Sequence, residues 1–407
     1  MCYKTPPMVN GKACNIRHLI IGCGWAIALT LVLAEASWAR PQYATRHRIN
    51  NCMACHYQPT GGGPKNPDGK RYQSRWLKIN PLLIQDYVSA DFRTLFYRPE
   101  KQKTAAGGSG VMAGSVAGHA SLDDKQQVHL VIEHNVAGFS SGQLRDTYAQ
   151  YRLGNFGQAK NLDTIMAGRF RVPFGMVSDE HRTYTDIQSG SQWFTFETGM
   201  MFSGNPSYKL HWDFAAINGL NNTGQSLRDG GSELWGSVIN LRWMPSFFFV
   251  GASGRLNDTE EDYPSYALAL YTQISVDGIT QGRLPLALSI EGVRARGFNS
   301  NLARGYVSSN TYAQSLERST SEGLLTRIEY TLNPYWVLVY KFDRLLPDQD
   351  YPSDYYERHG FGFRWHFAPA SQIIFRNEWA TATHPSESAK TGTLAQDATF
   401  LILEVSI

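Results

Sequence analysis

The residues best suited to chemistry are Cys52, Cys55 and His56, which form the pattern Cys-Met-Ala-Cys-His. Two thiols at this spacing can each add to one vinyl group of a haem, and the adjacent imidazole then reaches the iron. This order of residues is the one that covalent attachment of a c-type haem requires. The sequence therefore predicts one covalent haem c, bound by Cys52 and Cys55 and ligated by His56.

Three other interpretations of two close cysteines fit less well. A thioredoxin-type redox motif needs a strand–helix–strand context, which the surrounding pattern lacks. A zinc site needs four ligands with more widely separated donors. A disulfide between Cys52 and Cys55 would close a very small loop, so it would add little stability. Haem attachment remains the favoured use of this motif.

Residues 1–39 have the pattern of a secretory signal peptide. A basic stretch precedes an apolar core over 19–33, and small residues follow at 37–39. The apolar core is too short for a transmembrane helix. Cleavage after Ala39 leaves Cys52 and Cys55 as the only cysteines, which excludes a disulfide framework and a four-cysteine zinc site.

From Val88 onward the chain alternates between apolar and polar residues. In the run 361–367 every odd position is aromatic, and the even positions are Gly, Arg and His. In the run 336–343 the even positions are Trp, Leu, Tyr and Phe, whereas Lys341 and Asp343 fall on odd positions. A period of two indicates strands with one apolar and one wet face, as in a transmembrane β-barrel.

About sixteen such segments follow one another, and an even number is typical of bacterial barrels. The predicted strands are 88–97, 110–121, 125–136, 145–154, 162–172, 191–203, 207–218, 232–244, 247–257, 263–276, 284–297, 320–332, 335–344, 357–367, 370–382 and 396–407. The longer gaps at 173–190, 219–231, 298–319 and 383–395 are predicted to be outer loops, because they are rich in small polar residues. Short turns at 333–334 and 368–369 suit the periplasmic side.

A soluble β-sandwich would also alternate, but three features favour the membrane barrel. Aromatic residues cluster near segment ends, as in interfacial girdles. Charges of both signs share the opposite face, and more than ten strands follow one another without a helix, which favours closure. The net charge of +3 gives no support to a nucleic-acid partner.

The layout resembles the fused monohaem cytochrome–porins of iron-oxidising bacteria. This resemblance rests on Cys52 to His56 and on the preceding run Tyr43-Ala44-Thr45-Arg46. Separately, Gly168 to Gly175 resembles a strand and turn of phosphate-selective porins. The resemblance to the cytochrome–porins implies a signal peptide over 1–39, a monohaem segment over 40–87 within the lumen or periplasm, and an outer-membrane barrel over 88–407. It also implies that Cys52 and Cys55 hold the haem and that His56 ligates iron, as in a distant member of that family.

The sixth ligand of the haem iron is open on the sequence alone. His47, five residues before Cys52, is the favoured candidate. The alternatives lie on the first predicted strands, from which they could reach inward: Met112, His119, His129 and His134.

These expectations suggest an electron conduit across the outer membrane. Its partners would be outer-membrane lipid, an extracellular donor or acceptor such as Fe(II), and a periplasmic cytochrome or other soluble carrier. The alternatives are a solute or anion porin with a haem-containing plug or sensor, and a haem enzyme such as a peroxidase. Acidic runs at 258–262 and 348–350 could attract Fe(II), although acidic loops are usually just solvated.

Overall fold

The computed structural model describes residues 56, 69 and 87–406, with gaps at 100–107, 124–126, 139–143, 154–159, 177–182, 192–194, 219–234, 245–246, 259–264, 299–318, 334, 369–370 and 384–396. The predicted signal peptide over 1–39 and nearly all of the predicted haem segment over 40–87 lie outside the described residues. The described residues contain no helix long and apolar enough to cross a membrane.

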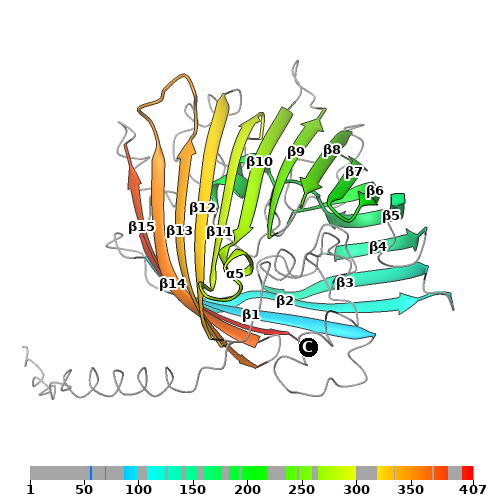
Figure 1. Ribbon diagram of the computed structural model, residues 1–407, viewed down its shortest axis with the longest axis horizontal. Coiled ribbons are helices and arrows are strands. Elements are labelled where there is room, and N and C mark those ends of the chain that lie inside the picture. Colours follow the sequence, from blue (N-terminus) through cyan, green and yellow to red (C-terminus); the bar gives the residue numbers. More distant parts are fainter. Residues whose placement is uncertain are drawn as a thin grey trace, which may run out of the picture. The chain divides into compact units, whose positions relative to one another are not determined.

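Sixteen antiparallel strands form one closed barrel, in which each strand pairs with its sequence neighbours and β1 pairs with β16 (Figure 1). The strands are β1 (Val88–Pro99), β2 (Gly108–Ser121), β3 (Val128–Gly138), β4 (Leu144–Arg152), β5 (Lys160–Arg171), β6 (Phe196–Ser207), β7 (Leu210–Ile217), β8 (Gly236–Trp243), β9 (Phe248–Asn257), β10 (Ser265–Ser275), β11 (Leu286–Arg296), β12 (Thr320–Asn333), β13 (Trp336–Leu346), β14 (Tyr356–Ala368), β15 (Ser371–Ala382) and β16 (Ala398–Ser406). The predicted sixteen-stranded antiparallel barrel is confirmed. Each predicted segment corresponds to one strand, and one of the larger offsets is at 191–203, where β6 begins at Phe196.

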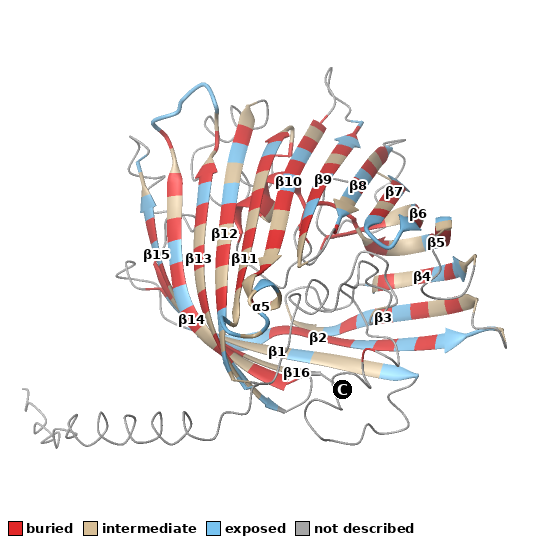
Figure 2. Ribbon diagram, in the orientation of Figure 1, coloured by how far each residue is buried: buried red, intermediate tan, exposed pale blue. Residues whose placement is uncertain are grey.

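The two faces of the wall differ as the alternation predicts. On β10, Ala267, Ala269 and Tyr271 are buried, whereas Leu268 and Leu270 between them are exposed. Figure 2 shows the same alternation of buried and exposed residues along the other strands. Because the exposed positions are apolar, this face suits lipid, and the polar side chains face inward.

Aromatic side chains gather on the outer face of β13 to β15. The rings of Trp336 and Trp365 stack with centroids 5.5 Å apart, and Phe363 stacks on Phe375 at 5.4 Å. These cross-strand pairs tie neighbouring strands together. Large rings on the lipid-facing side are expected near the membrane interfaces.

The outer face makes a direct stability prediction at Leu270, which is 70% exposed in the middle of β10. Leu270→Lys is expected to lower the free energy of unfolding by about 2–4 kcal/mol in lipid vesicles, because a cation must then face the hydrocarbon. Urea unfolding measures the change. The matched control is Tyr208→Lys in the turn between β6 and β7, where Tyr208 is 79% exposed and the effect should be under about 0.5 kcal/mol. Equal effects at both positions would contradict a lipid-facing Leu270.

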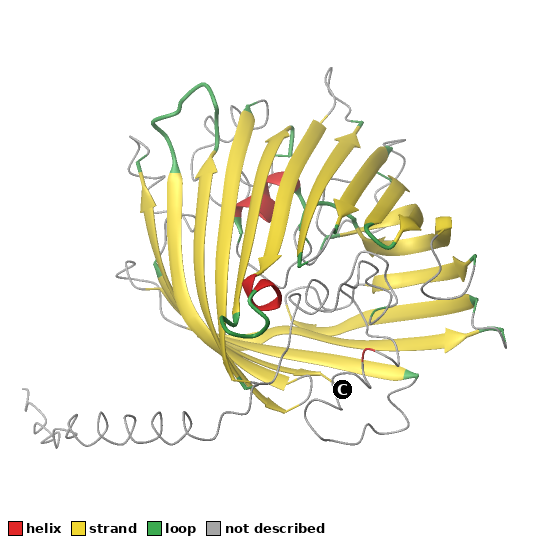
Figure 3. Cartoon of the chain, in the orientation of Figure 1, coloured by secondary structure: helices red, strands yellow, loops and turns green. Residues whose placement is uncertain are grey.

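The connection from β5 to β6, predicted over 173–190, joins its strands at the same end of the barrel as the connections predicted at 219–231, 298–319 and 383–395, but its described residues fold into the barrel. It contains the short helix α4 (Tyr184–Ser189), which contacts β11, β12 and β13 (Figure 3). Thr183 caps the helix by accepting a hydrogen bond from Asp186 N, and Gly190 ends it in the left-handed conformation. Tyr184 and Ile187 are buried against β13 and β14, so the segment turns inward.

We call residues 172–191 the inward segment; they are described over 172–176 and 183–191. The largest cluster of buried apolar side chains joins its first residues to the inner wall, since Val172 and Phe174 belong to it together with Tyr148, Met166 and Phe298. A second short helix, α5 (Val276–Ile279), forms part of the turn between β10 and β11. The core of the protein therefore lies inside the barrel wall.

Candidate functional site

The structure describes only one of the four predicted haem residues. His56 is half-buried, whereas Cys52, Cys55 and His47 lie outside the described residues. The haem site and the favoured sixth ligand therefore stay predictions.

The alternative sixth ligands on the barrel strands lie on different faces of the wall. Met112, His119 and His129 are buried on the inner side of β2 and β3. His134 is exposed on the outer side, so the expectation that it could reach inward is wrong. His129 and His134 are an odd number of residues apart on one strand, and side chains alternate sides with a period of two. The structure thus leaves three wall donors that face inward.

The inner wall of β13 to β15 carries a buried ion pair that spans one strand. Lys341 Nζ lies 2.9 Å from Glu378 Oε1, and the two side chains are 0% and 1% exposed. Gly360 lies between them in the register, opposite both residues. Because glycine has no side chain, Lys341 can cross β14 to reach the carboxylate.

Further pairs extend this charged wall over β12 to β14. Arg364 Nη1 lies 3.0 Å from Glu329 Oε1, and Arg358 Nη2 lies 2.7 Å from Asp343 Oδ2. All four side chains are almost fully buried. Removing one partner of such a pair would leave an uncompensated buried charge, which is strongly destabilising. This side of the lumen is lined by charges that neutralise each other.

Glu291 on β11 holds both arms of the inward segment. Its Oε1 accepts a hydrogen bond from Met176 N at 2.7 Å, and its Oε2 accepts one from Thr185 Oγ1 at 3.2 Å. Glu291 is 2% exposed. One buried carboxylate therefore fixes two points of the segment that lie on either side of residues 177–182.

Asp343 and Arg358 hold the start of α4. The backbone N–H of Tyr184 donates to both oxygens of Asp343, at 3.1 and 3.0 Å. The guanidinium of Arg358 lies 4.3 Å from the centre of the Tyr184 ring. The first N–H groups of a helix have no acceptor within the helix. The carboxylate of Asp343 on the barrel wall supplies the acceptor for one of them, and its negative charge suits the N-terminal end of the helix.

Arg255 on β9 holds the end of α4. Its guanidinium donates to the carbonyl oxygens of Ser189 and Gly190 at 3.4 and 3.1 Å, and it pairs with Glu197. Arg255 is 1% exposed, and its charge also lies 4.8 Å from the centre of the Phe298 ring. Both ends of the helix are thus fixed to the inner wall by buried charged groups.

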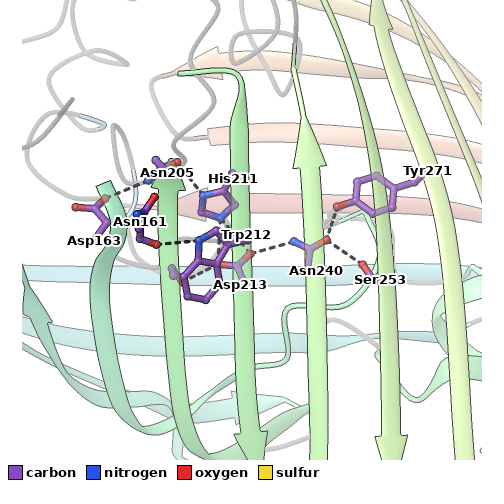
Figure 4. A network of polar contacts seen from close by, with 10 residues as sticks. Asn161, Asp163, Asn205, His211, Trp212, Asp213, Asn240, Ser253 and Tyr271 are labelled. Carbon is purple, nitrogen blue, oxygen red and sulfur yellow. Dashed lines mark hydrogen bonds and ion pairs between the residues drawn. The ribbon is translucent and has the colours of Figure 1, made fainter. Parts of the chain in front are cut away.

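A polar network crosses the inner wall from β5 to β10 (Figure 4). Asn205 Nδ2 donates to Asp163 Oδ2 at 3.1 Å, and Asn205 Oδ1 lies 2.9 Å from His211 Nδ1. His211 Nε2 lies 3.0 Å from Asp213 Oδ1. Asn240 Nδ2 then donates to Asp213 Oδ2 at 3.0 Å.

The network continues beyond Asn240 toward the inward segment. Asn240 Oδ1 accepts hydrogen bonds from Ser253 Oγ at 2.9 Å and from Tyr271 OH at 2.5 Å. Ser253 Oγ in turn accepts a hydrogen bond from Gly175 N at 3.1 Å. A continuous chain of hydrogen bonds therefore links His211 to the backbone of the inward segment.

The acidic run at 348–350 makes a turn. Asp350 N donates to Asp348 Oδ1 at 3.0 Å, and Asp350 is exposed. Among the described residues no group of three or more His, Cys, Asp or Glu side chains could hold a metal ion. Most of the run at 258–262 lies outside the described residues.

Comparison with solved structures identifies the architecture. The outer-membrane protein OmpF of Salmonella typhi, solved with daunomycin, matches with a TM-score of 0.54 at 9% identity, over 79% of this chain and 97% of that one. The fold is that of an outer-membrane porin. A loop-deletion mutant of OmpT of Vibrio cholerae matches this porin fold with a TM-score of 0.53 at 8% identity, over 79% and 98% of the two chains.

The anion-selective porin of Comamonas acidovorans matches the same porin fold with a TM-score of 0.52 at 9% identity, over 79% and 98% of the two chains. No family model and no curated sequence matches the chain. At such low sequence identity, the similarity shows the fold alone. This fold agrees with the outer-membrane location that the sequence predicts.

Sequence reasoning did not single out the residues that hold the inward segment. His211 and Asp213 were visible as polar positions between Leu210, Trp212 and Phe214, but alternation alone does not show which side chains meet. Their partners come from other strands, and only the register brings them together. Arg255 and Glu291 carried no signal beyond a charge at one position of an alternating strand.

Proposed function

We propose that the protein is an outer-membrane electron conduit with one covalent haem c bound by Cys52, Cys55 and His56. The single observation that carries the proposal is that one chain combines the motif Cys-Met-Ala-Cys-His over 52–56 with a closed sixteen-stranded barrel that begins at Val88. The lipid-facing band of a barrel is about 25 Å tall, and electrons cannot cross such an insulating layer unaided. A haem carried by the segment ahead of β1 would shorten that distance.

The described residues offer partners that suit such a group. Met112, His119 and His129 provide a thioether and two imidazoles on the inner face of β2 and β3, and both types of donor serve as axial ligands of haem iron. When bound, the haem supplies one-electron redox chemistry. His47 is proposed as the sixth ligand, with these wall residues as the alternatives.

The paired charges of the inner wall also favour a conduit over an open channel. In a water-filled pore, lumen charges are expected to be hydrated. Here Lys341, Asp343, Arg358 and Arg364 are at most 1% exposed. A lumen wall with such shielded charges does not resemble the surface of a wide aqueous channel.

Reduction by Fe(II) tests the proposal on the purified full chain. The protein should keep its haem after denaturing electrophoresis, and Fe(II) at acidic or neutral pH should produce the absorption bands of reduced haem. A chain without covalent haem would overturn the proposal. If dithionite reduces the haem but Fe(II) does not, Fe(II) is not the donor. The conduit would then receive electrons from another donor.

A solute porin is the second candidate, and the inward segment favours it. A segment that enters the barrel and is fixed to the opposite wall narrows the lumen, as a selective pore would need. One protein with this fold, from Comamonas acidovorans, is an anion-selective porin. Steady conductance in planar bilayers that does not change with the haem redox state would favour this function over the conduit.

A further inference from the structure

His211 is fully buried on β7, and both of its ring nitrogens face oxygen atoms (Figure 4). Nδ1 lies 2.9 Å from Asn205 Oδ1. Nε2 lies 3.0 and 3.1 Å from the two oxygens of Asp213. A neutral imidazole has one donor and one acceptor nitrogen, so the character of these oxygens decides its protonation.

The side-chain amide of Asn205 is oriented by a neighbour. Its Nδ2 donates to Asp163 Oδ2 at 3.1 Å, so the atom that faces the imidazole is the carbonyl oxygen Oδ1. A carbonyl oxygen only accepts hydrogen bonds. Nδ1 of His211 must therefore carry a hydrogen.

Asp213 faces the other nitrogen as an acceptor. Its Oδ1 accepts from Ser203 Oγ at 2.6 Å, and its Oδ2 accepts from Asn240 Nδ2 at 3.0 Å. Asn240 is oriented in turn, because its Oδ1 accepts from Ser253 and Tyr271. Donors on both oxygens favour the ionised carboxylate, and an ionised Asp213 can only accept, so Nε2 of His211 then carries a hydrogen as well.

We infer that His211 is held as a buried imidazolium. Its second proton completes the hydrogen bonds that join β5 to β8 and that, through Asn240 and Ser253, support the inward segment. We call this proton the latch. Loss of this proton would turn one ring-nitrogen lone pair toward Asn205 Oδ1 or Asp213. Two acceptors facing each other in a buried site repel, so the network would open. This inference does not depend on a bound haem.

The charged groups around His211 agree with this charge state. Asp213 contacts it directly, and Asp163 contacts it through Asn205. Two cations face the same region: Arg242 lies opposite His211 on β8, and Lys160 lies opposite Asn205 on β5. The Arg242 guanidinium lies toward the Phe249 ring at 5.9 Å, and Lys160 Nζ donates to Leu153 O at 2.9 Å. Asp213 is the charged group with a direct contact to the imidazole.

Nitrogen NMR of the full chain with labelled histidine tests the charge state. The protein has eleven histidines, and the His211 signals are assigned as those lost in His211→Gln or, if that variant does not fold, as those shifted most in Asp163→Asn. At neutral pH both ring nitrogens of His211 should have the shift of protonated nitrogen. One unprotonated nitrogen at that pH would overturn the inference.

Thermal unfolding as a function of pH tests the latch. From neutral to alkaline pH the melting temperature of the wild type should fall more steeply than that of His211→Gln, because the variant has no second proton to lose. His359→Gln is the matched control: His359 is exposed on the outer face of β14, and this variant should follow the wild type. Parallel curves for wild type and His211→Gln, where that variant folds, would show that the proton is no latch. If it does not fold, the same comparison is made with Asp163→Asn, which should flatten the curve, and a curve parallel to the wild type would overturn the latch.

Discussion

A variant with Cys52→Ala and Cys55→Ala is expected to lose all covalent haem while its barrel still folds. The barrel closes through the pairing of β1 with β16, and β1 begins at Val88, well after the motif. Both thioether bonds disappear with the two thiols, so no haem can remain after denaturation. Haem staining after electrophoresis and the heat-dependent mobility of the folded barrel measure the two outcomes.

The control for this variant keeps the attachment and changes only the far side of the iron. His47→Ala should retain the full haem stain but change the low-spin spectrum if His47 is the sixth ligand. An unchanged spectrum in His47→Ala, followed by a changed one in His119→Ala or His129→Ala, would move the ligand to the wall. Full staining of the double cysteine variant would disprove covalent attachment at this motif.

The strands of the barrel could be predicted because the pattern that specifies each strand lies within that strand's own residues. In a membrane barrel each strand faces lipid on one side and the lumen on the other, so the period of two is written into every strand. The run 361–367 shows this: Phe361 and Trp365 are exposed, whereas Gly362 and Arg364 are buried. Strand order needed little further information, since every pair except the closing pair of β1 and β16 joins neighbours in sequence.

The contacts inside the barrel could not be predicted, because their partners are distant in sequence. Tyr184 and Asp343 are 159 residues apart, and Met176 and Glu291 are 115 apart. The polar, loop-like composition over 173–190 does not show where the segment lies. Its polar groups can form hydrogen bonds with water outside the barrel or with polar side chains of the inner wall. The six residues of α4 are also too few to show a helical period.

Glu291→Ala is expected to destabilise the protein and to loosen the inward segment. The substitution leaves Met176 N and Thr185 Oγ1 without their acceptor in a buried site. Each unsatisfied buried donor costs about 1–3 kcal/mol, so the free energy of unfolding should fall by about 2–6 kcal/mol. Urea unfolding in lipid vesicles measures this loss, and planar bilayers should show a larger and less steady current than the wild type.

Two variants separate the hydrogen bonds of Glu291 from its charge. Glu291→Gln keeps one acceptor oxygen, so it should recover part of the lost stability if the role of Glu291 is to accept from the segment. Glu322→Ala removes a carboxylate from neighbouring β12, but Glu322 lies on the surface, 3.9 Å from Arg294, with a side chain 49% exposed. That change should cost under about 1 kcal/mol and leave the current unchanged. A Glu291→Ala protein as stable as Glu322→Ala would mean that the other contacts of the segment, with Asp343, Arg255 and Ser253, are enough to hold it.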